Sequence, residues 1–365
     1  MKLHILQQVL ESFAPRAYQE SYDNSGIQLG EPDTEIYGAL VTLDVTEEIV
    51  EEAIQKKCNL IVSHHPVLFH SLNSITGKNP VERIILKAIR FNIAIYSIHT
   101  SLDNYRYGLN AFVAQKLGLT GVSLLMPKTG TLSKLVTFCP LDHAGKVRQA
   151  MFEAGAGHIG NYDCCSYNSD GKGTFRALEN THPYVGKLNE LHFENETRIE
   201  VIFPSYLTPV IVDALLKNHP YEEVAYDVYS LSNQDPLSGS GITGRLENPE
   251  EEKEFLTRIK EIFGIPVLRH SSLTGKPVQK VSICTGAGGF LLQKAMEINS
   301  DAFLTSDLRY HDFFIPDGKL LLVDTGHYES EHFVKELISS MLIEKFSTFA
   351  ILISEINTNP VNYYI

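Results

Sequence analysis

The sequence predicts an α/β protein (α+β) in which two α/β lobes form one discontinuous domain and a smaller ferredoxin-like domain is inserted between them. In the first and last thirds of the chain, short apolar runs typical of buried strands alternate with amphipathic helical segments. In the middle third this rhythm changes to strand, helix, three strands, helix and strand, which resembles a split βαβ module. The predicted domains are therefore residues 1–127 with 240–365, and residues 128–239.

The bulk composition narrows the class of protein. At 365 residues, with 43% hydrophobic and 21% charged residues, the chain has an ordinary globular composition and is long enough for two or three domains. The formal net charge of −13 and the lack of a Lys/Arg-rich run disfavour nucleic acid as a partner. No apolar stretch approaches twenty residues, no signal peptide opens the chain, and the five cysteines form no regular framework. We therefore expect a cytoplasmic protein without a membrane partner.

The first lobe is predicted from its apolar periodicity. Helical spacing ends before Pro15, and Thr46 is a plausible N-cap of a later helix. The expected helices are 3–13, 45–57, 80–91 and 110–117, and the expected strands are 38–44, 59–62 and 93–98.

Polar side chains follow three successive strands of this lobe. Asp44 ends the first, His64 and His65 follow the second within Ser63-His64-His65-Pro66, and His99 with Asp103 follows the third. Ligands of open α/β sheets bind at the carboxyl ends of strands. We therefore expect these side chains to converge on one rim of the sheet. For His64 and His65 taken alone, the alternatives are a loop that merely carries two histidines, or one core histidine and one exposed histidine.

The middle segment carries no catalytic constellation. Strands are expected at 134–139, 198–203 and 225–231, helices at 143–155 and 207–218, and a hairpin turn at Ser169-Asp170-Gly171-Lys172-Gly173 between two further strands. The string from His219 to Val224 resembles the equivalent stretch of CutA divalent-ion tolerance proteins, relatives of the PII signalling proteins. Scattered histidines and the adjacent pair Cys164-Cys165 are more often structural or incidental than metal ligands. An oligomerisation or regulatory role is expected for this segment.

The last lobe resumes the alternation of strands and helices. We expect helices at 248–263 and from about 327 to 342, and strands at 278–284, 302–305 and 320–324. The turn Thr285-Gly286-Ala287-Gly288-Gly289 can cradle an anion but fits no nucleotide motif, so a tight packing turn is favoured.

Three histidines near the ends of predicted strands lie four residues from a carboxylate. These pairs are His99 with Asp103, Asp307 with His311, and His327 with Glu331. On a helix this spacing brings an imidazole and a carboxylate to one face, where they can hold one ion or bridge two. Together with the His64-His65 pair, they predict a metal site built from both ends of the chain.

In combination these motifs resemble the GTP cyclohydrolase 1 type 2 homolog family, the Nif-three-like proteins. The matching strings are Asp23-Asn24-Ser25-Gly26, Ser63-His64-His65-Pro66, Ser97 to Asp103, Gly286-Ala287-Gly288-Gly289, Thr305-Ser306-Asp307 with His311, and Gly326 to Glu331. The resemblance implies two lobes around a dinuclear metal site, a CutA-like insert and a ring-shaped homohexamer. Tyr22 stands where the family often has tryptophan, a difference at a pocket wall.

The resemblance also implies the roles of individual residues. The metal ligands would be His64, His65, Asp103, His327 and Glu331. His99, Asp307 and His311 would lie behind the ligands or face the substrate, and His99 or His311 would be the catalytic proton shuttle, because imidazole titrates near neutral pH.

The expected activity follows from this site. Two divalent ions (Zn, Fe or Mn) with open positions would support a metal-dependent hydrolase acting on a small nucleotide-like or phosphorylated substrate. The alternative is a non-catalytic metal-binding or regulatory protein whose insert senses a ligand. No nucleotide-specific motif supports opening of the GTP purine ring, which the family name suggests.

Overall fold

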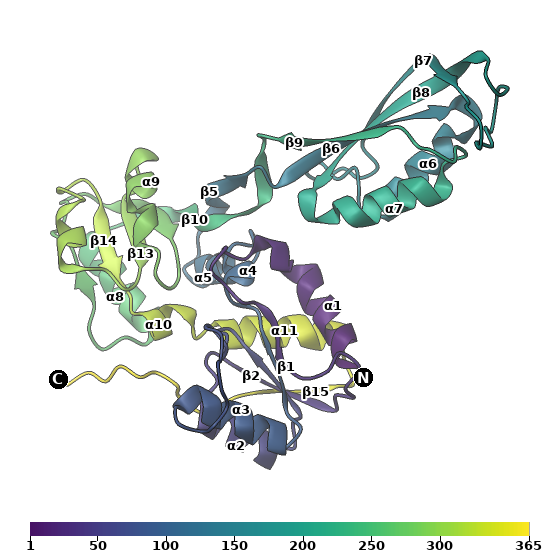
Figure 1. Ribbon diagram of the computed structural model, residues 1–365. Helices are drawn as coiled ribbons and strands as arrows, with labels where there is room; N and C mark the ends of the chain where they lie inside the picture. Colours follow the sequence, from purple (N-terminus) through teal and green to yellow (C-terminus); the bar gives the residue numbers. More distant parts are fainter. Residues whose placement is uncertain (365) are drawn as a thin grey trace. The chain divides into compact units, whose positions relative to one another are not determined.

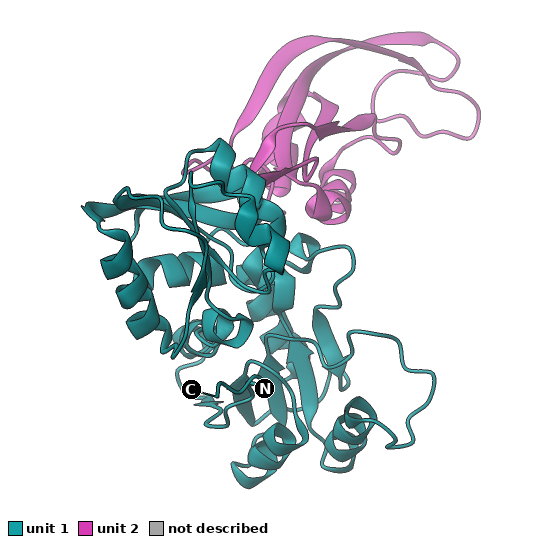
Figure 2. Cartoon of the chain, turned by 90° about the vertical axis from the view of Figure 1, so that its left-hand side faces the viewer, with its two compact units in different colours: residues 1–126, 237–365 teal, residues 127–236 magenta. Residues whose placement is uncertain are grey.

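The computed structural model describes residues 1–364 and contains two compact units (Figure 2). Unit 1 is formed by residues 1–126 and the described residues from 237 onward, and unit 2 by residues 127–236. Unit 2 is therefore continuous in sequence, whereas unit 1 is assembled from both ends of the chain.

The first sheet of unit 1 has five strands in the order β1-β4-β3-β2-β15. Figure 1 labels β1, β2 and β15 of this sheet. Strands β2, β3, β4 and β15 are parallel, and β1 is antiparallel to β4. In register, Thr42 lies beside Ser63 and Ser63 beside Ser97, so the carboxyl ends of the three central strands lie level. The strands are β1 (Gly26–Leu29), β2 (Gly38–Thr42), β3 (Leu60–Ser63), β4 (Ala94–Ser97) and β15 (Ala350–Ile353).

Both faces of this sheet are covered, as its uninterrupted apolar strands require. Within β3, Ile61 packs in one core with helices α2 and α3, while Leu60 and Val62 belong to the core that contains α1, α5 and α11. The helices of this half are α1 (Leu3–Phe13), α2 (Glu47–Gln55), α3 (Pro80–Arg90), α4 (His99–Asp103), α5 (Leu109–Lys116) and α11 (Val334–Lys345), with the 3-10 helix η1 (Arg16–Tyr18).

The second sheet of unit 1 has six strands in the order β11-β14-β13-β12-β10-β5. Its centre, β12-β13-β14, is parallel, and Thr305 lies beside Asp324 at the level carboxyl ends. The strands are β5 (Thr120–Thr129), β10 (Gln234–Glu250), β11 (Arg269–His270), β12 (Val278–Ile283), β13 (Ala302–Thr305) and β14 (Leu321–Asp324). The helices are α8 (Glu252–Phe263), α9 (Leu292–Glu297) and α10 (His327–Glu331), with η3 (Gly289–Leu291) and η4 (Tyr310–Phe314).

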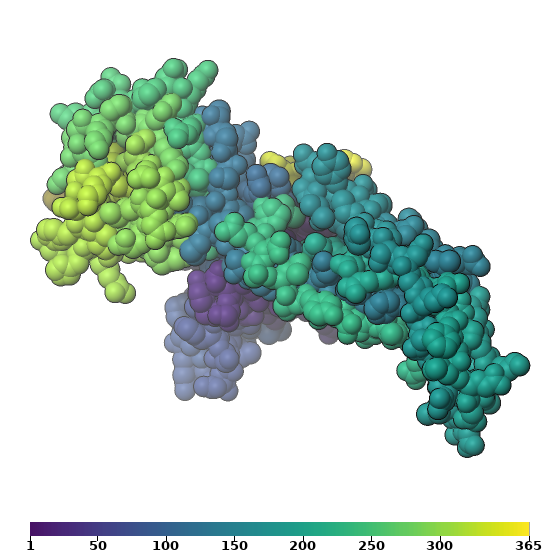
Figure 3. Space-filling model, turned by 90° about the horizontal axis from the view of Figure 1, so that it is seen from above, coloured from purple at the N-terminus to yellow at the C-terminus, as the bar shows by residue number. Residues whose placement is uncertain are grey.

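One hydrophobic core joins the two sheets of unit 1. Val62 of β3 and Leu304 of β13 belong to the same buried cluster, together with Phe255 of α8 and Ile338 of α11. In Figure 3 the green and yellow-green atoms of the second sheet and its helices lie together as one continuous surface. The shared core holds the two sheets together, and with them the residues that follow their strands.

Unit 2 is a four-stranded antiparallel sheet in the order β7-β8-β6-β9, with two helices packed on it. Along the chain the order is β6-α6-β7-β8-α7-β9, which is the order of a split βαβ, ferredoxin-like module. The likeness to CutA and PII proteins stays a prediction. The elements are β6 (Leu132–Pro140), α6 (Leu141–Glu153), β7 (Ser166–Arg176), β8 (Leu191–Pro204), η2 (Ser205–Leu207), α7 (Thr208–Asn218) and β9 (Tyr226–Leu231).

Two local predictions were wrong. The glycine-containing segment 169–173 is not a hairpin turn but the middle of β7, whose residues pair with β8 from Ser166 to Arg176. The continuous ladder along β8 outweighs the turn preference of this short segment. The helix expected at 327–342 is divided into α10 and α11, which ends at Lys345.

No helix within residues 1–364 has the length and apolar character needed to cross a lipid bilayer. The five cysteines are free.

The N-cap of α2 gives a first testable prediction. Thr46 Oγ1 accepts a hydrogen bond from the Ile49 backbone N–H at 3.3 Å, as expected of an N-cap residue. Replacing Thr46 with alanine is expected to lower the free energy of unfolding of unit 1 by about 1 kcal/mol. Urea denaturation followed by circular dichroism measures this loss. Thr46→Ser keeps the acceptor and is expected to retain the wild-type stability, and an equal loss in both variants would contradict the capping role.

Candidate metal centre

Five of the predicted side chains meet where strands of both sheets end. His64 and His65 directly follow β3, Asp103 ends the short helix α4 after β4, and α10 begins with His327 and ends with Glu331 after β14 (Figure 1). Residues almost 270 positions apart in the sequence therefore contribute to one cluster.

The carboxylate of Glu331 lies at the centre of the cluster. Its Oε2 atom is 2.9 Å from His65 Nε2, 3.1 Å from His327 Nε2 and 3.9 Å from His64 Nε2. The residue is only 4% exposed. His64, His65 and Glu331 each offer one ligand atom, and these atoms lie within 4.8 Å of one another. One oxygen atom is thus surrounded by three imidazoles.

His64 and Asp103 form the deepest part of the cluster. His64 Nε2 is 3.6 Å from Asp103 Oδ1, too far for a direct hydrogen bond. The side chain of His64 is 0% exposed, and within residues 1–364 neither of its ring nitrogens nor Asp103 Oδ1 has a hydrogen-bond partner. An unsatisfied buried polar group costs about 1–3 kcal/mol. Buried polar atoms without hydrogen-bond partners indicate a ligand-binding position between the two side chains.

Carboxylates outside the cluster orient two of its imidazoles. His65 Nδ1 donates to Asp44 Oδ1 at 2.7 Å, and His327 Nδ1 donates to Asp307 Oδ2 at 2.7 Å. An ionised carboxylate only accepts hydrogen bonds, so both Nδ1 atoms carry the hydrogen and both Nε2 atoms are left to bind elsewhere. Metal-binding histidines in proteins are commonly held in this way.

The centre of the cluster is therefore short of positive charge. His65 Nε2 and His327 Nε2 are 3.4 Å apart, and both lie against Glu331 Oε2. In the neutral tautomers all three atoms are acceptors, and they repel one another unless a proton or a metal ion lies between them. The residues present fit a divalent cation, because imidazole nitrogens and carboxylate oxygens suit Zn²⁺, Fe²⁺ or Mn²⁺.

The pKa shifts of these residues agree with a shortage of positive charge at the centre of the cluster. Burial opposes protonation of His65 and of His327, but the hydrogen bonds with Asp44 and Glu331 raise the pKa of His65 to about 10, and those with Glu331 and Asp307 raise the pKa of His327 to about 9. Burial alone raises the pKa of the Glu331 carboxyl, yet the two imidazoles outweigh it and hold that pKa well below its usual value. A site that attracts protons this strongly also attracts cations.

In His64 and Asp103, burial outweighs the stabilisation of the charged form. Burial keeps the pKa of His64 well below its usual value, so its imidazole is neutral and able to bind a metal. Burial and the nearby charge of Glu331 raise the pKa of Asp103 well above its usual value. A cation bound between His64 and Asp103 would remove this penalty.

The glycine-rich turn after β12 shapes the site rather than binding an anion by itself. Gly286 adopts a left-handed φ of 65°, and a Cβ atom at this position would collide with the Glu331 carboxylate. Its N–H donates to Ser330 Oγ at 3.1 Å. Glycine is therefore required here so that Glu331 can reach its position, a role that the sequence prediction of a packing turn did not include.

His99 lies beside the cluster and is held in place by Asp23. Its ring centroid is 5.4 Å from those of both His64 and His65, and its Nδ1 donates to Asp23 Oδ1 at 2.6 Å. Asp23 also accepts from the backbone N–H and the hydroxyl of Thr100, and its pKa lies far below the usual value because, against burial, the hydrogen bond and charge of His99 stabilise the carboxylate. His99 has a left-handed φ of 34°, a strained conformation of the kind found at functional sites.

The other predicted catalytic residue lies elsewhere. His311 is exposed in η4, where its ring contacts Tyr310 and Phe314. Asp307 lies outside that helix with a φ of 57°, so the two do not share a helical face. Asp307 instead contacts His327. A role for His311 stays a prediction.

A cavity of about 630 Å³ opens beside His65 and His327. Both imidazoles line it, and the segment from Asn359 to Tyr363 forms one of its walls. Asn359 Nδ2 and the Tyr363 hydroxyl both donate to Glu329 Oε1 there. The cavity is in the size range of small-molecule sites, and two of the candidate ligands are exposed to it.

Fold and site together define a class: an α/β protein with two sheets on a shared core and a buried histidine–carboxylate cluster at the ends of their strands. The family model of Duf34/NIF3 (NGG1p interacting factor 3) matches residues 1–360, and the chain belongs to this family.

Relatives match over the whole length of the chain. A GTP cyclohydrolase 1 type 2 homolog of Bacillus subtilis is 36% identical over 98% of this chain and 97% of its own, and one of Staphylococcus epidermidis is 32% identical over 100% of both. The crystal structure of a Bacillus cereus protein related to NIF3 has 33% identity and a TM-score of 0.86, covering 100% of this chain and 99% of its own. The family suggested by the sequence motifs is thereby confirmed.

Proposed function

We propose that this protein is a metal-dependent hydrolase that holds two divalent ions through His64, His65, Asp103, His327 and Glu331. The observation that supports this most directly is the pair of unpartnered, buried groups, His64 and Asp103 Oδ1, beside a second group of converging acceptors around Glu331. Five N and O ligands for two ions leave coordination positions open, which favours catalysis over a closed structural site.

When bound, two such ions would lower the pKa of a shared water and stabilise the attacking and leaving oxygens. The residues of the chain then have separate tasks. Glu331, whose Oε2 lies near three imidazole nitrogens, would hold the metal together with these histidines. Asp44 and Asp307 hold the Nε2 atoms of His65 and His327 toward it. His99 keeps Nε2 free to accept a proton, because its Nδ1 is bound to Asp23.

The proposed substrate is a small nucleotide-like or phosphorylated molecule. Relatives carry the name GTP cyclohydrolase 1 type 2 homolog, and the cavity beside the cluster has space for a small ligand. Its wall includes Arg269, whose guanidinium is paired with Asp324. Asp44, Asp307 and Glu329 also line it, so the metal ions would have to supply most of the attraction for an anion.

Metal analysis and turnover test the proposal together. Protein purified without chelators is expected to contain about two divalent ions per chain and, loaded with Mn²⁺, Fe²⁺ or Zn²⁺, to hydrolyse a member of a panel of nucleotides and phosphoesters. Fewer than about one ion per chain would rule out the two-metal site. Bound metal without turnover on any substrate would favour the second candidate, a non-catalytic metal-binding or regulatory protein, for which the ligand-sized cavity of unit 2 is the supporting observation.

We further propose a homohexameric ring in the cytoplasm. Family resemblance supports the ring, and the five free cysteines agree with a reducing compartment. Native mass spectrometry measures the assembly, and a monomer or dimer at micromolar concentration would contradict it.

Asp23 is expected to act as a positioning residue for His99. Asp23→Asn removes the carboxylate that fixes the Nδ1 hydrogen of His99, and we expect kcat to fall about 10–100-fold with KM and metal content unchanged. Steady-state kinetics and elemental analysis measure these quantities. Asp33→Asn, at an exposed residue paired with Lys2, is the control and keeps wild-type kinetics. Loss of metal in Asp23→Asn would instead make Asp23 part of the metal-binding structure.

A further inference from the structure

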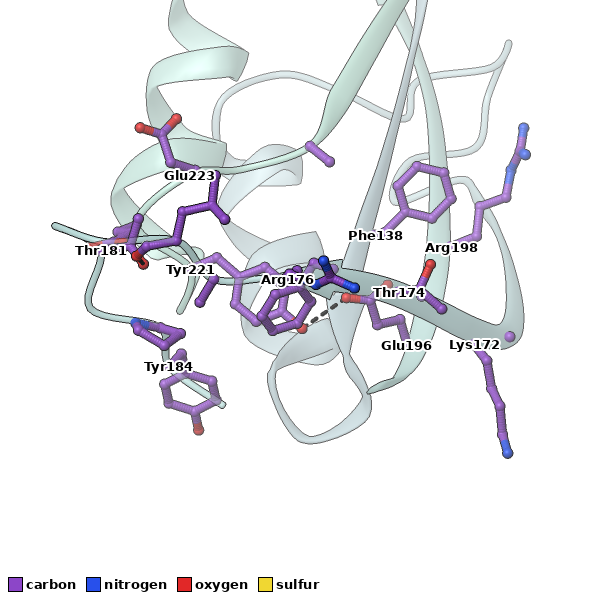
Figure 4. Close-up of a pocket in the computed structure, with 18 of the residues that line it drawn as sticks. Phe138, Lys172, Thr174, Arg176, Thr181, Tyr184, Glu196, Arg198, Tyr221 and Glu223 are labelled. Atoms are coloured by element: carbon purple, nitrogen blue, oxygen red, sulfur yellow. Dashed lines mark hydrogen bonds between the residues drawn. The ribbon is translucent and has the colours of Figure 1, made fainter. Parts of the chain in front are cut away.

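Unit 2 contains a cavity of about 710 Å³ that is separate from the metal centre (Figure 4). All of its lining residues lie between Phe138 and Ala225, so it is formed by unit 2 alone. The volume is within the range of small-molecule binding sites. Strands β6, β7 and β8 provide one wall, and the loops around Tyr184 and Tyr221 provide another.

The register of the sheet places an acid, a base and an aromatic ring on one face. Glu196 and Arg198 are two residues apart in β8, so their side chains leave the same face about 6.6 Å apart. Phe138 of β6 lies directly opposite Arg198, and Gly171 of β7 directly opposite Glu196. Figure 4 shows the side chains of Phe138, Glu196 and Arg198 along the strands that line the cavity.

Glu196 is a buried acceptor with a single partner. It is 8% exposed, and Oε1 accepts a hydrogen bond from the Tyr221 hydroxyl at 2.8 Å. Within residues 1–364 no lysine, arginine or histidine forms an ion pair with this carboxylate. The other oxygen lies over Gly173, where any Cβ atom would fill its place. A carboxylate buried with one donor is stabilised by further N–H donors from a ligand.

Arg198 offers the complementary group. Its Nε donates to Glu200 at 2.9 Å, and its guanidinium lies 5.9 Å from the centroid of the Phe138 ring. The guanidinium has five donors in a fixed fork, so a bond through Nε leaves the terminal nitrogens able to bind an anion.

Aromatic rings complete the cavity. The centroid of Tyr221 is 6.1 Å from that of Phe175 and 6.3 Å from that of Tyr184. Such rings favour a flat, apolar group of a ligand over water.

We propose that this cavity binds a small aromatic ligand that carries both an N–H donor, bound by Glu196, and an anionic group, bound by Arg198. A mononucleotide and an aromatic amino acid share this chemistry. The site is independent of the proposed metal-dependent hydrolysis, since none of its residues belongs to unit 1.

Isothermal titration calorimetry of the full chain, stripped of metal with a chelator, tests the proposal with guanosine monophosphate and with L-tryptophan. At least one of the two is expected to bind. If it is the nucleotide, guanosine (without the anion) and phenyl phosphate (without the N–H donor) are each expected to bind about 10-fold more weakly. If it is the amino acid, tryptamine (without the anion) and 3-phenylpropionate (without any N–H donor) take the same roles. Binding of neither parent ligand overturns the proposal.

Matched variants locate the binding. Glu196→Gln and Arg198→Gln are each expected to weaken binding about 10-fold or more, whereas Arg148→Gln, on α6 outside the cavity and bonded to Asn168, is expected to change it less than about 2-fold. His65→Ala, in unit 1, is expected to bind as the wild type does. If Glu196→Gln fails to fold by circular dichroism, Tyr221→Leu removes an aromatic wall and is expected to weaken binding. Wild-type affinity in the folded cavity variants, or loss in His65→Ala, overturns the proposal.

Discussion

A Glu331→Gln variant is expected to lose more than about 100-fold in metal affinity and to show no measurable hydrolysis. Replacing a residue that only supports a metal ligand lowers metal affinity or activity about 10–100-fold. Glu331 contacts three imidazoles directly, so a larger loss is expected. The amide keeps the size of the side chain but removes its charge, and its NH₂ group would face the Nε2 atoms as a donor. Elemental analysis and turnover of the loaded protein measure the two effects.

The control for this variant is Glu336→Gln. Glu336 is five residues further along the chain in α11, half exposed and paired with Lys116 at 2.7 Å, away from the cluster. It is expected to retain full metal content and activity. Wild-type metal content in Glu331→Gln would contradict the central place of this carboxylate.

Chelation is expected to lower the thermal unfolding midpoint of unit 1 while leaving that of unit 2 unchanged. A ligand that binds only the folded state at 1,000 times its dissociation constant stabilises that state by about 4 kcal/mol. For a unit of about 250 residues this corresponds to a shift of roughly 8–16 °C. The candidate ligands all belong to unit 1, whereas unit 2 has its own hydrophobic core.

Differential scanning calorimetry resolves this effect as a shift of one transition relative to the other. Adding back Mn²⁺ or Zn²⁺ after removal of the chelator is expected to restore the first midpoint. Equal shifts of both transitions would show a general effect of the chelator, and the absence of any shift would contradict a metal site that stabilises the fold.

The sequence predicted the parts of the fold that follow from local patterns. Apolar runs such as 59–62 and 320–324 are strands because both faces of their sheets are buried, and the polar residues after them lie together because parallel strands end level. The prediction of a turn at 169–173 was wrong because it depended on the local sequence alone. Its glycines favour a turn locally, but pairing with β8, which is distant in sequence, holds it extended.

The support of the site could not be predicted in the same way. Asp23 was part of a matching motif, yet its bond to His99 joins residues 76 positions apart, and no periodicity links them. The need for glycine at 286 depends on Glu331, 45 residues later, whose carboxylate fills the space of a side chain. For His311 the local pattern was misleading. Its spacing from Asp307 suggested a shared helical face, which the chain does not form.

The last strand of the first sheet has a consequence for how the protein is made. Strand β15 pairs with β2 in parallel, so residues 350–353 complete a sheet that begins with residues 26–29. During synthesis at 5–20 residues per second, unit 2 emerges whole, while the N-terminal sheet waits roughly ten seconds or more for its edge strand and for Glu331. The metal centre therefore matures only after Glu331 has been synthesised, and a ribosome that stalls after residue 236 would release a chain with a finished insert and no site.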